Sequence, residues 1–243
     1  MPFKKLKGGD YLLAFDHLVV YGESIENDIE KASKQNEVVV VKGGHHEPWG
    51  TYNYLAFMNN NSYIEWLGIE DKEKAHASDN PLIQHTAYAH QQKMEEPIQF
   101  ALRTNQMDKL IHHFNKQEIP YQGPFPGSRV KPDGSTLKWR MLFPKYQMND
   151  EILPFLIEWE GEGNQPPNEE SVNEMDFSTI QVGVSDIQKA SKQFEQTYRL
   201  GQPKIIHNQN EHYIAEWPLD NGRLQLVKGE GLKANFGDLV MSR

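Results

Sequence analysis

The string YIEWLG occupies residues 63–68, and a closely similar string, LIEWEG, occupies residues 156–161. A second pair of strings also matches, with IEKASKQ at residues 29–35 and IQKASKQ at residues 187–193. Internal similarity of this kind indicates a chain built from repeated structural units. Because short identities arise by chance, the order of the predicted elements around them has to support the repeat.

The first unit is predicted to run strand, helix and three strands. The apolar run YLLAFDHLVVYG at residues 11–22 predicts a buried strand, and SIENDIEKASKQNE at residues 24–37 predicts a helix with Ser24 as its N-cap. Three further strands are predicted, at residues 38–41, 51–58 and 62–69.

The same order recurs twice along the chain. The second unit has a strand at 97–104, a helix at 107–118, a loop rich in Pro and Gly at 120–134, and strands at 137–143 and 153–159. The third has a strand at 177–186, a helix at 187–200, and strands at 204–207, 211–217 and 223–227, with no element predicted after Gly229. The matched strings fall at equivalent places in these units, so we predict an α+β fold of repeated βαβββ modules.

Linkers separate the predicted modules. We predict a first module over residues 1–75, a linker over 76–96, a second module over 97–161, a linker over 162–176, and a third, partly degenerate module with a tail over 177–243. The first linker is polar and rich in His, with a helix predicted near residues 81–88, whereas the second is acidic and contains two prolines.

Composition excludes several classes of function. The net charge of −9 disfavours a nucleic-acid partner, because an acidic surface repels phosphates. The chain has no Cys, which rules out disulfides, thiolate metal sites and a Cys nucleophile. No apolar stretch is long enough to span a membrane, and no apolar segment follows the basic N-terminus, so we expect a cytoplasmic protein with no membrane partner. No phosphate-binding Gly motif or nucleophile-elbow motif occurs, and therefore no nucleotide cofactor is expected.

Three polar residues interrupt apolar strands. His17 lies in the first predicted strand, while Glu65 and Glu158 lie in the two IEW strings. Alternation places Glu65 on one face with Tyr63 and Leu67. If that face is buried, the carboxylate needs a partner or a metal; if it faces solvent, the residue is ordinary. Periodicity does not choose between these alternatives.

Several motifs together resemble the glyoxalase-like domain of the vicinal-oxygen-chelate superfamily. They are FDHLVV, GGHHEPWGTYN and YIEWLG in the first module, and ALRT, PDGSTLKWRML and LPFLIEW in the second. The resemblance covers residues 12–161 and is weaker in the third module. It implies that two βαβββ modules pair into a half-open barrel of curved mixed sheets around a small-molecule pocket.

The resemblance also implies a divalent metal ion, either Zn, Ni, Mn or Fe. Its ligands would come from the first and last strands of each module, which correspond to His17, Gln99, Glu65 and Glu158. Gln99 departs from the family pattern, where His is usual. Such a metal would act as a Lewis acid, and Glu65, Glu158 or His46 would move a proton, as in a lyase or isomerase with an enolate-like intermediate.

Further side chains match the family's substrate-binding positions. They are Trp49, Thr51, Asn53, Arg103, Arg129, Trp139 and Arg140. An Arg within an apolar strand either faces a cavity, where it suits a carboxylate or phosphate, or pairs with a carboxylate such as Glu65 or Glu158. The second arrangement would argue against a metal.

Two functions therefore remain open. The first is a metal-dependent lyase or isomerase, and the second is a non-catalytic protein that binds or sequesters a small molecule, with Trp49, Trp66, Trp139 and Trp159 lining its pocket. In the third module Thr179 replaces His17, and Gln225 or Leu226 replaces Glu65. That module is therefore predicted to be structural, and because it is unpaired we expect a homodimer.

Overall fold

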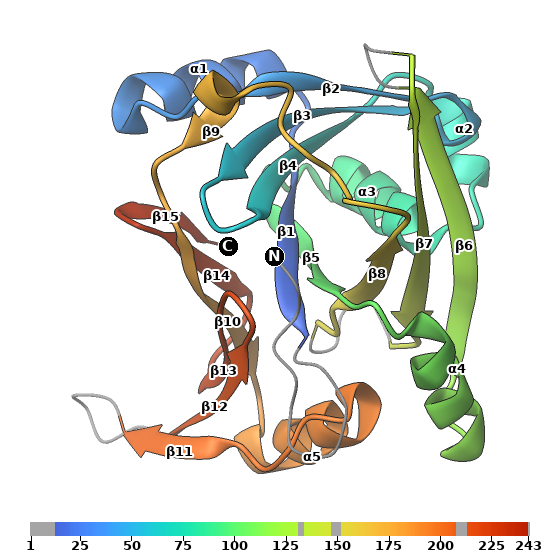
Figure 1. Ribbon diagram of the computed structural model, residues 1–243, viewed down its shortest axis with the longest axis vertical. Helices are drawn as coiled ribbons and strands as arrows, with labels where there is room; N and C mark the ends of the chain where they lie inside the picture. The colour runs from blue at the N-terminus through green and yellow to red at the C-terminus, as the bar shows by residue number, and fades with distance from the viewer. Residues whose placement is uncertain (1–12, 131–133, 147–151, 208–212, 243) are drawn as a thin grey trace.

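The strand–helix–three-strand order occurs three times in the protein, as Figure 1 shows. The structure, a computed structural model, describes residues 13–130, 134–146, 152–207 and 213–242. A nine-stranded sheet holds the first two repeats, and a six-stranded sheet holds the third. The α+β class with curved mixed sheets is confirmed. The module boundaries at residues 75, 97, 161 and 177 stay a prediction.

The large sheet has the strand order β2-β3-β4-β1-β5-β8-β7-β6, and the short β9 pairs with β3. The first repeat supplies β1 (Ala14–Tyr21), α1 (Ile25–Asn36), β2 (Val41–His46), β3 (Thr51–Met58) and β4 (Ser62–Ile69). The second supplies β5 (Pro97–Arg103), α4 (Met107–Lys116), β6 (Tyr121–Val130), β7 (Thr136–Pro144) and β8 (Phe155–Trp159). Two helices, α2 (Lys72–Ala77) and α3 (Pro81–Gln92), lie between these repeats in the chain.

The first strands of the two repeats join them into one sheet. β1 pairs with β4 in parallel and with β5 in antiparallel orientation, so His17 lies beside both Tyr63 and Ala101. This confirms that the strands carrying His17 and Glu65 are neighbours. Val19, Leu67 and Ala101 belong to an inner hydrophobic cluster that includes residues of α3, whereas the opposite face of the sheet packs into the main core.

The third repeat forms the smaller sheet, with the order β11-β12-β13-β10-β14-β15. It contains β10 (Phe177–Val184), α5 (Ile187–Tyr198), β11 (Lys204–His207), β12 (Tyr213–Leu219), β13 (Gly222–Lys228), β14 (Leu232–Phe236) and β15 (Leu239–Ser242). The absence of any element after Gly229 was a wrong prediction, because β14 and β15 form a hairpin there.

That hairpin occupies the edge where a partner module was expected. β14 pairs antiparallel with β10, in the place that β5 takes beside β1. Both pairings even share a register shift, after Phe15 in β1 and after Phe177 in β10. A homodimer that paired through this edge would have to displace the hairpin, so the expected homodimer stays a prediction without that support.

Two segments that were not predicted as strands form strands in the structure. β2 starts at Val41 and includes the residues GGHH, with a register shift between Lys42 and His45, rather than covering residues 38–41. The Pro- and Gly-rich segment at 120–134 contains β6, which lies at the edge of the sheet. Edge strands tolerate Pro because one side of the strand needs no backbone donors, which is why the composition misled the prediction.

The main core joins the two sheets. Phe15 of β1 stacks on Phe177 of β10, with ring centroids 3.8 Å apart and an interplanar angle of 6°. Asn221 accepts a hydrogen bond from the Phe15 nitrogen and donates to the Phe15 oxygen. Both sheets therefore bury their apolar faces in one continuous core.

No helix in the described part of the chain is both long and apolar enough to cross a bilayer.

Candidate functional site

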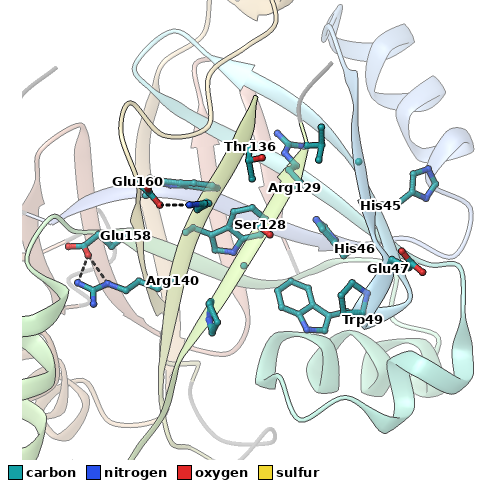
Figure 2. A pocket seen from close by; sticks show the side chains of 18 residues that line it. His45, His46, Glu47, Trp49, Ser128, Arg129, Thr136, Arg140, Glu158 and Glu160 are labelled. Carbon is teal, nitrogen blue, oxygen red and sulfur yellow. Dashed lines mark hydrogen bonds and ion pairs between the residues drawn. The ribbon is translucent and has the colours of Figure 1, made fainter. Parts of the chain in front are cut away.

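An open cleft lies between β2 and the following turn on one side and β6, β7 and β8 on the other (Figure 2). Its volume is about 1060 Å³. Behind it lies a small inner cavity of about 40 Å³, which reaches into the large sheet. Both spaces are lined by the same five side chains, which form the boundary between them: His46, Trp49, Arg129, Trp139 and Trp159.

His17 and Glu65 lie together at the inner cavity. The His17 Nε2 atom is 3.4 Å from Glu65 Oε2, and the His17 Nδ1 atom is 2.7 Å from Asp16 Oδ1. All three side chains are buried. The parity predicted for Glu65 is confirmed, and the buried alternative applies: its carboxylate has protein partners.

A register irregularity makes this cluster possible. Neighbouring residues of a regular strand point to opposite faces, which would separate Asp16 from His17. The pairing of β1 with β5 shifts between Phe15 and His17, so both side chains reach the same hydrogen-bonded chain. Asp16 also accepts from Arg103 Nη1 and from Trp159 Nε1, each at 3.0 Å.

Asn53 holds Glu65 from the other side. Its amide nitrogen donates to Glu65 Oε1 at 2.5 Å, and its amide oxygen accepts from the Gly44 nitrogen at 2.8 Å. A Cβ on Gly43 would lie 2.1 Å from the Asn53 amide oxygen. The lack of a Cβ at Gly43 thus permits the close approach of Asn53 that fixes the carboxylate.

Opposite charges decide the protonation of the buried pair. Burial disfavours the charged form of His17, but its hydrogen bonds to Asp16 and Glu65 outweigh burial and raise the pKa of His17 to about 9. Burial likewise opposes ionisation of Glu65, yet the hydrogen bond and charge of His17 lower its pKa. At neutral pH an imidazolium therefore lies between two carboxylates.

His46 differs from His17 in its protonation. Its Nδ1 atom is 3.1 Å from Thr51 Oγ1, and its ring lies 5.8 Å from that of Trp49. Burial lowers the pKa of His46 and outweighs the nearby charge of Glu65. His46 is therefore a neutral imidazole at the boundary of the inner cavity.

Glu158 does not join His17 and Glu65. It accepts from Arg140 Nε at 2.7 Å and from the Met107 nitrogen at 3.0 Å, at the start of α4. Figure 2 shows the Glu158–Arg140 pair on the side of β7 away from His46 and Trp49. The shared IEW string is misleading here, because Ile157, and not Glu158, lies on the face of the sheet that carries Glu65 and lines the inner cavity.

The strand pairings explain why Glu158 lies on the opposite face of the sheet from Glu65. Tyr63 pairs with His17, and Glu65 follows it by two residues in β4. Phe155 pairs with Ala101, the neighbour of His17, and Ile157 follows it by two residues in β8. A shift of one residue moves a side chain to the other face of a sheet. Glu158 therefore lies on the face that packs against α4.

The remaining predicted metal ligand is also engaged elsewhere. Gln99 Nε2 donates to the Tyr146 hydroxyl and the Leu153 oxygen, and Gln99 Oε1 accepts from the Phe100 nitrogen. Among the described residues, no group of three or more His, Cys, Asp or Glu side chains is arranged to hold a metal ion. The side chains present do not fit the four-ligand metal site that the resemblance implies.

The predicted substrate-binding residues divide into two groups. Four of them line the inner cavity: Trp49, Asn53, Arg129 and Trp139. Thr51 supports His46, while Arg103 pairs with Asp16 and Arg140 with Glu158 and Asp108. Trp66 belongs to the main core, so it does not line this pocket.

Sequence reasoning missed Asp16, Tyr63 and Asn164. Asp16 is adjacent to His17, and the alternation of a regular strand would place it on the other face. Tyr63 stacks on the His17 ring with centroids 4.5 Å apart. Asn164 lies in the predicted second linker, yet it accepts from Arg129 Nη2 at 2.6 Å and lines the inner cavity. No local pattern distinguishes that Asn from its polar neighbours.

The comparisons with known proteins agree with this architecture. The family model described as a glyoxalase-like domain matches residues 15–198. A hypothetical protein from Staphylococcus aureus has the same fold, with 21% identity and a TM-score of 0.73 over 96% of this chain and 88% of its own. No curated protein matches the sequence.

Methylmalonyl-CoA epimerases are more distant structural neighbours. The enzyme from Mycobacterium tuberculosis is 13% identical, with a TM-score of 0.45 over 68% of this chain and 94% of its own. A Streptomyces coelicolor epimerase, in complex with 2-nitronate-propionyl-CoA, is 14% identical, with a TM-score of 0.46 over 62% of this chain and 99% of its own.

The fold and the family match together assign the chain to the vicinal-oxygen-chelate superfamily. Within that superfamily, the chain belongs to the glyoxalase-like domain family.

Proposed function

We propose that the chain binds a small oxygenated molecule with a planar anionic group, and that it does so without a divalent metal. The position of Arg129 carries this proposal. Lys138 and Arg140, which also line the cleft, contact carboxylates, whereas Arg129 donates to the neutral amide of Asn164. Within the described ranges no carboxylate forms an ion pair with Arg129, so its guanidinium suits a carboxylate on a ligand.

The walls of the cleft favour a flat ligand. Trp49, Trp139 and Trp159 all lie at the boundary of the inner cavity, and the Trp139 and Trp159 rings are 5.4 Å apart. Indole faces provide large apolar contact areas for planar groups. A cavity of about 40 Å³ has room for about one water molecule. The body of the ligand would therefore lie in the outer cleft, with one small group directed toward Glu65.

A pair of matched probes tests the anionic class. 2-Naphthoate is a planar carboxylate, and 2-naphthamide is its neutral counterpart. Isothermal titration should show that Arg129→Ala weakens naphthoate binding at least about ten-fold, equivalent to about 1.4 kcal/mol, and leaves naphthamide binding unchanged. Arg223→Ala, which changes an exposed Arg in β13 of the smaller sheet, is the control. Equal naphthoate binding by the wild-type and Arg129→Ala proteins would contradict the proposal.

The metal question has its own measurement. Elemental analysis of protein purified without a His tag should give far less than one equivalent of Zn, Ni, Mn or Fe, because His17 and Glu65 pair with each other and Glu158 lies elsewhere. One equivalent of metal per chain in the wild-type protein, absent from Glu65→Gln, would contradict the proposal that binding needs no metal.

Proton transfer is a second candidate function. Glu65 and His46 both line the inner cavity, the first as a carboxylate with a lowered pKa and the second as a neutral imidazole. Two proton acceptors beside one cavity suit an isomerase or lyase that removes a proton next to a carbonyl. NMR in D₂O with a panel of 2-oxo acids would test it. Exchange of the proton next to the carbonyl, lost in Glu65→Gln, would support this candidate, and no exchange with the panel would count against it.

A further inference from the structure

The segment between the second and third repeats crosses the opening of the large sheet. We call residues 160–171 the strap. It leaves the end of β8, and the residues that follow it form β9 (Val172–Asn173), which pairs with β3 on the far side of the sheet (Figure 1). The strap thus connects β8 to β9, and four strands lie between these two in the sheet: β5, β1, β4 and β3.

Both ends of the strap are fixed. At its far end the buried Asn173 donates to the Val39 and Phe57 oxygens and accepts from the Val39 nitrogen at 2.7 Å. At its near end Gly163 packs on Trp159, where a Cβ would lie 3.3 Å from the indole ring. A strap held at both ends can place one of its side chains accurately between them.

Asn164 is the strap residue that reaches the site. Its amide oxygen accepts from Arg129 Nη2 at 2.6 Å, and its side chain also forms a hydrogen bond with Tyr63. Tyr63 stacks on His17. Asn164 therefore contacts both Arg129, at the boundary of the inner cavity, and Tyr63, which lies beside the His17–Glu65 pair. Asn164 also lines a second opening of about 560 Å³, which includes Asp16 and Arg103.

The Asn164 side chain that contacts Arg129 carries no charge. A carboxylate at this place would neutralise the Arg129 guanidinium, whereas an amide oxygen orients it and leaves its charge available. We infer that Asn164 is a positioning residue that holds Arg129 at the boundary of the cavity for an anionic ligand. This inference rests on the proposed function, and it makes the strap between the second and third repeats part of the binding site.

Two substitutions at one position separate orientation from charge. Asn164→Asp keeps the acceptor but pairs with Arg129, so naphthoate binding should weaken about ten-fold or more, while naphthamide binding stays unchanged. Asn164→Ala removes the acceptor and should weaken naphthoate binding by a smaller factor. Gln165→Ala is the matched control, because within the described ranges the Gln165 side chain donates only to the Glu162 oxygen, which also belongs to the strap. Unchanged naphthoate binding in Asn164→Asp would overturn the inference, as would equal loss of both probes.

A readout without ligand separates this inference from the proposed function. If Asn164 holds Arg129, then Asn164→Ala lowers the Tm of the wild-type protein and has a smaller effect in the Arg129→Ala background, where its hydrogen bond with Tyr63 remains to be lost. Should neither naphthyl probe bind the wild-type protein, the proposed function fails and the Tm cycle decides alone. Non-additive Tm shifts would then support the positioning of Arg129 by Asn164, and additive shifts would overturn it.

Discussion

His17 lies between two carboxylates in the interior of the large sheet, and this environment fixes its charge. Asp16 orients one ring nitrogen and Glu65 faces the other. Removing a single partner from a buried ion pair leaves an uncompensated charge, which typically costs about 3–5 kcal/mol. The residues that look most like metal ligands thus satisfy one another, and their burial requires no ion.

Stability should depend on pH through His17. A pKa raised from 6.5 to about 9 in the folded state contributes stability that is complete below pH 6.5 and is lost as the pH rises through 9. The unfolding free energy of the wild-type protein should therefore fall by an amount on the order of 3 kcal/mol between pH 6.5 and 10. The Tm should fall with it.

The variant His17→Gln is the control for this prediction. It lacks the titrating ring, so its Tm should change less over the same pH range in differential scanning calorimetry. A wild-type curve parallel to that of His17→Gln would show that His17 is not the group responsible. At low pH the wild-type protein should lose stability, because the hydrogen bond of His17 and the charge of Arg103 outweigh burial and lower the pKa of Asp16 in the folded state.

At the scale of elements, β2 shows how a strand shapes the site. Gly43 and Gly44, which lie outside the predicted strands, belong to an irregular strand whose backbone lets Asn53 approach Glu65. The two glycines face different surroundings. A Cβ on Gly43 would meet Asn53 at 2.1 Å, whereas a Cβ on Gly44 would meet Arg129 at an ordinary 3.6 Å.

Adjacent alanine substitutions should therefore differ sharply. Gly43→Ala should lower the unfolding free energy by about 1–3 kcal/mol, since it overpacks a buried contact and displaces Asn53. Gly44→Ala should change it by no more than about 0.5 kcal/mol, as is usual for substitutions that create no clash. Chemical denaturation of both variants measures the difference, and similar values would mean that Asn53 can move freely.

At the scale of the whole molecule, the third repeat is joined to the first two through a shared core. Phe15 and Phe177 stack between the sheets, and Asn60 donates to the oxygens of Phe177 and Asn221. Asn173 of β9, which follows the strap, adds a second connection through its hydrogen bond to the Phe57 oxygen. The third repeat, which lacks equivalents of His17 and Glu65, thereby supports the sheet that carries the site.

Truncation of the shared core should destabilise the entire chain. Phe177→Ala should cost about 3–5 kcal/mol, as for large aromatic side chains in well-packed cores. Because the core is continuous, unfolding should remain one transition. In a Trp217→Phe background, which removes the Trp of β12 in the smaller sheet, the remaining tryptophan fluorescence and the far-UV circular dichroism should change together. Separate transitions for the two signals would show that the sheets fold independently.

The sequence by itself determined the α+β class and the repeated order of elements, and it singled out His17 and Glu65 as polar residues in apolar strands. These depend on local periodicity and on polar residues within apolar strands, which a chain displays without its neighbours. β6 and the β14–β15 hairpin were not predicted. β6 and β15 lie at sheet edges, where a strand tolerates Pro and polar residues because one of its sides needs no partner.

Only the tertiary structure decided which predicted residues meet. Glu158 and Glu65 share the string IEW, but the pairing of β8 with β5 and β7 turns Glu158 toward Arg140 and α4. Asn164 reaches Arg129 because the strap crosses the sheet, which no local pattern encodes. Strand register and chain crossings are set by packing between distant segments, and a change of one residue in register reverses the face on which a side chain lies.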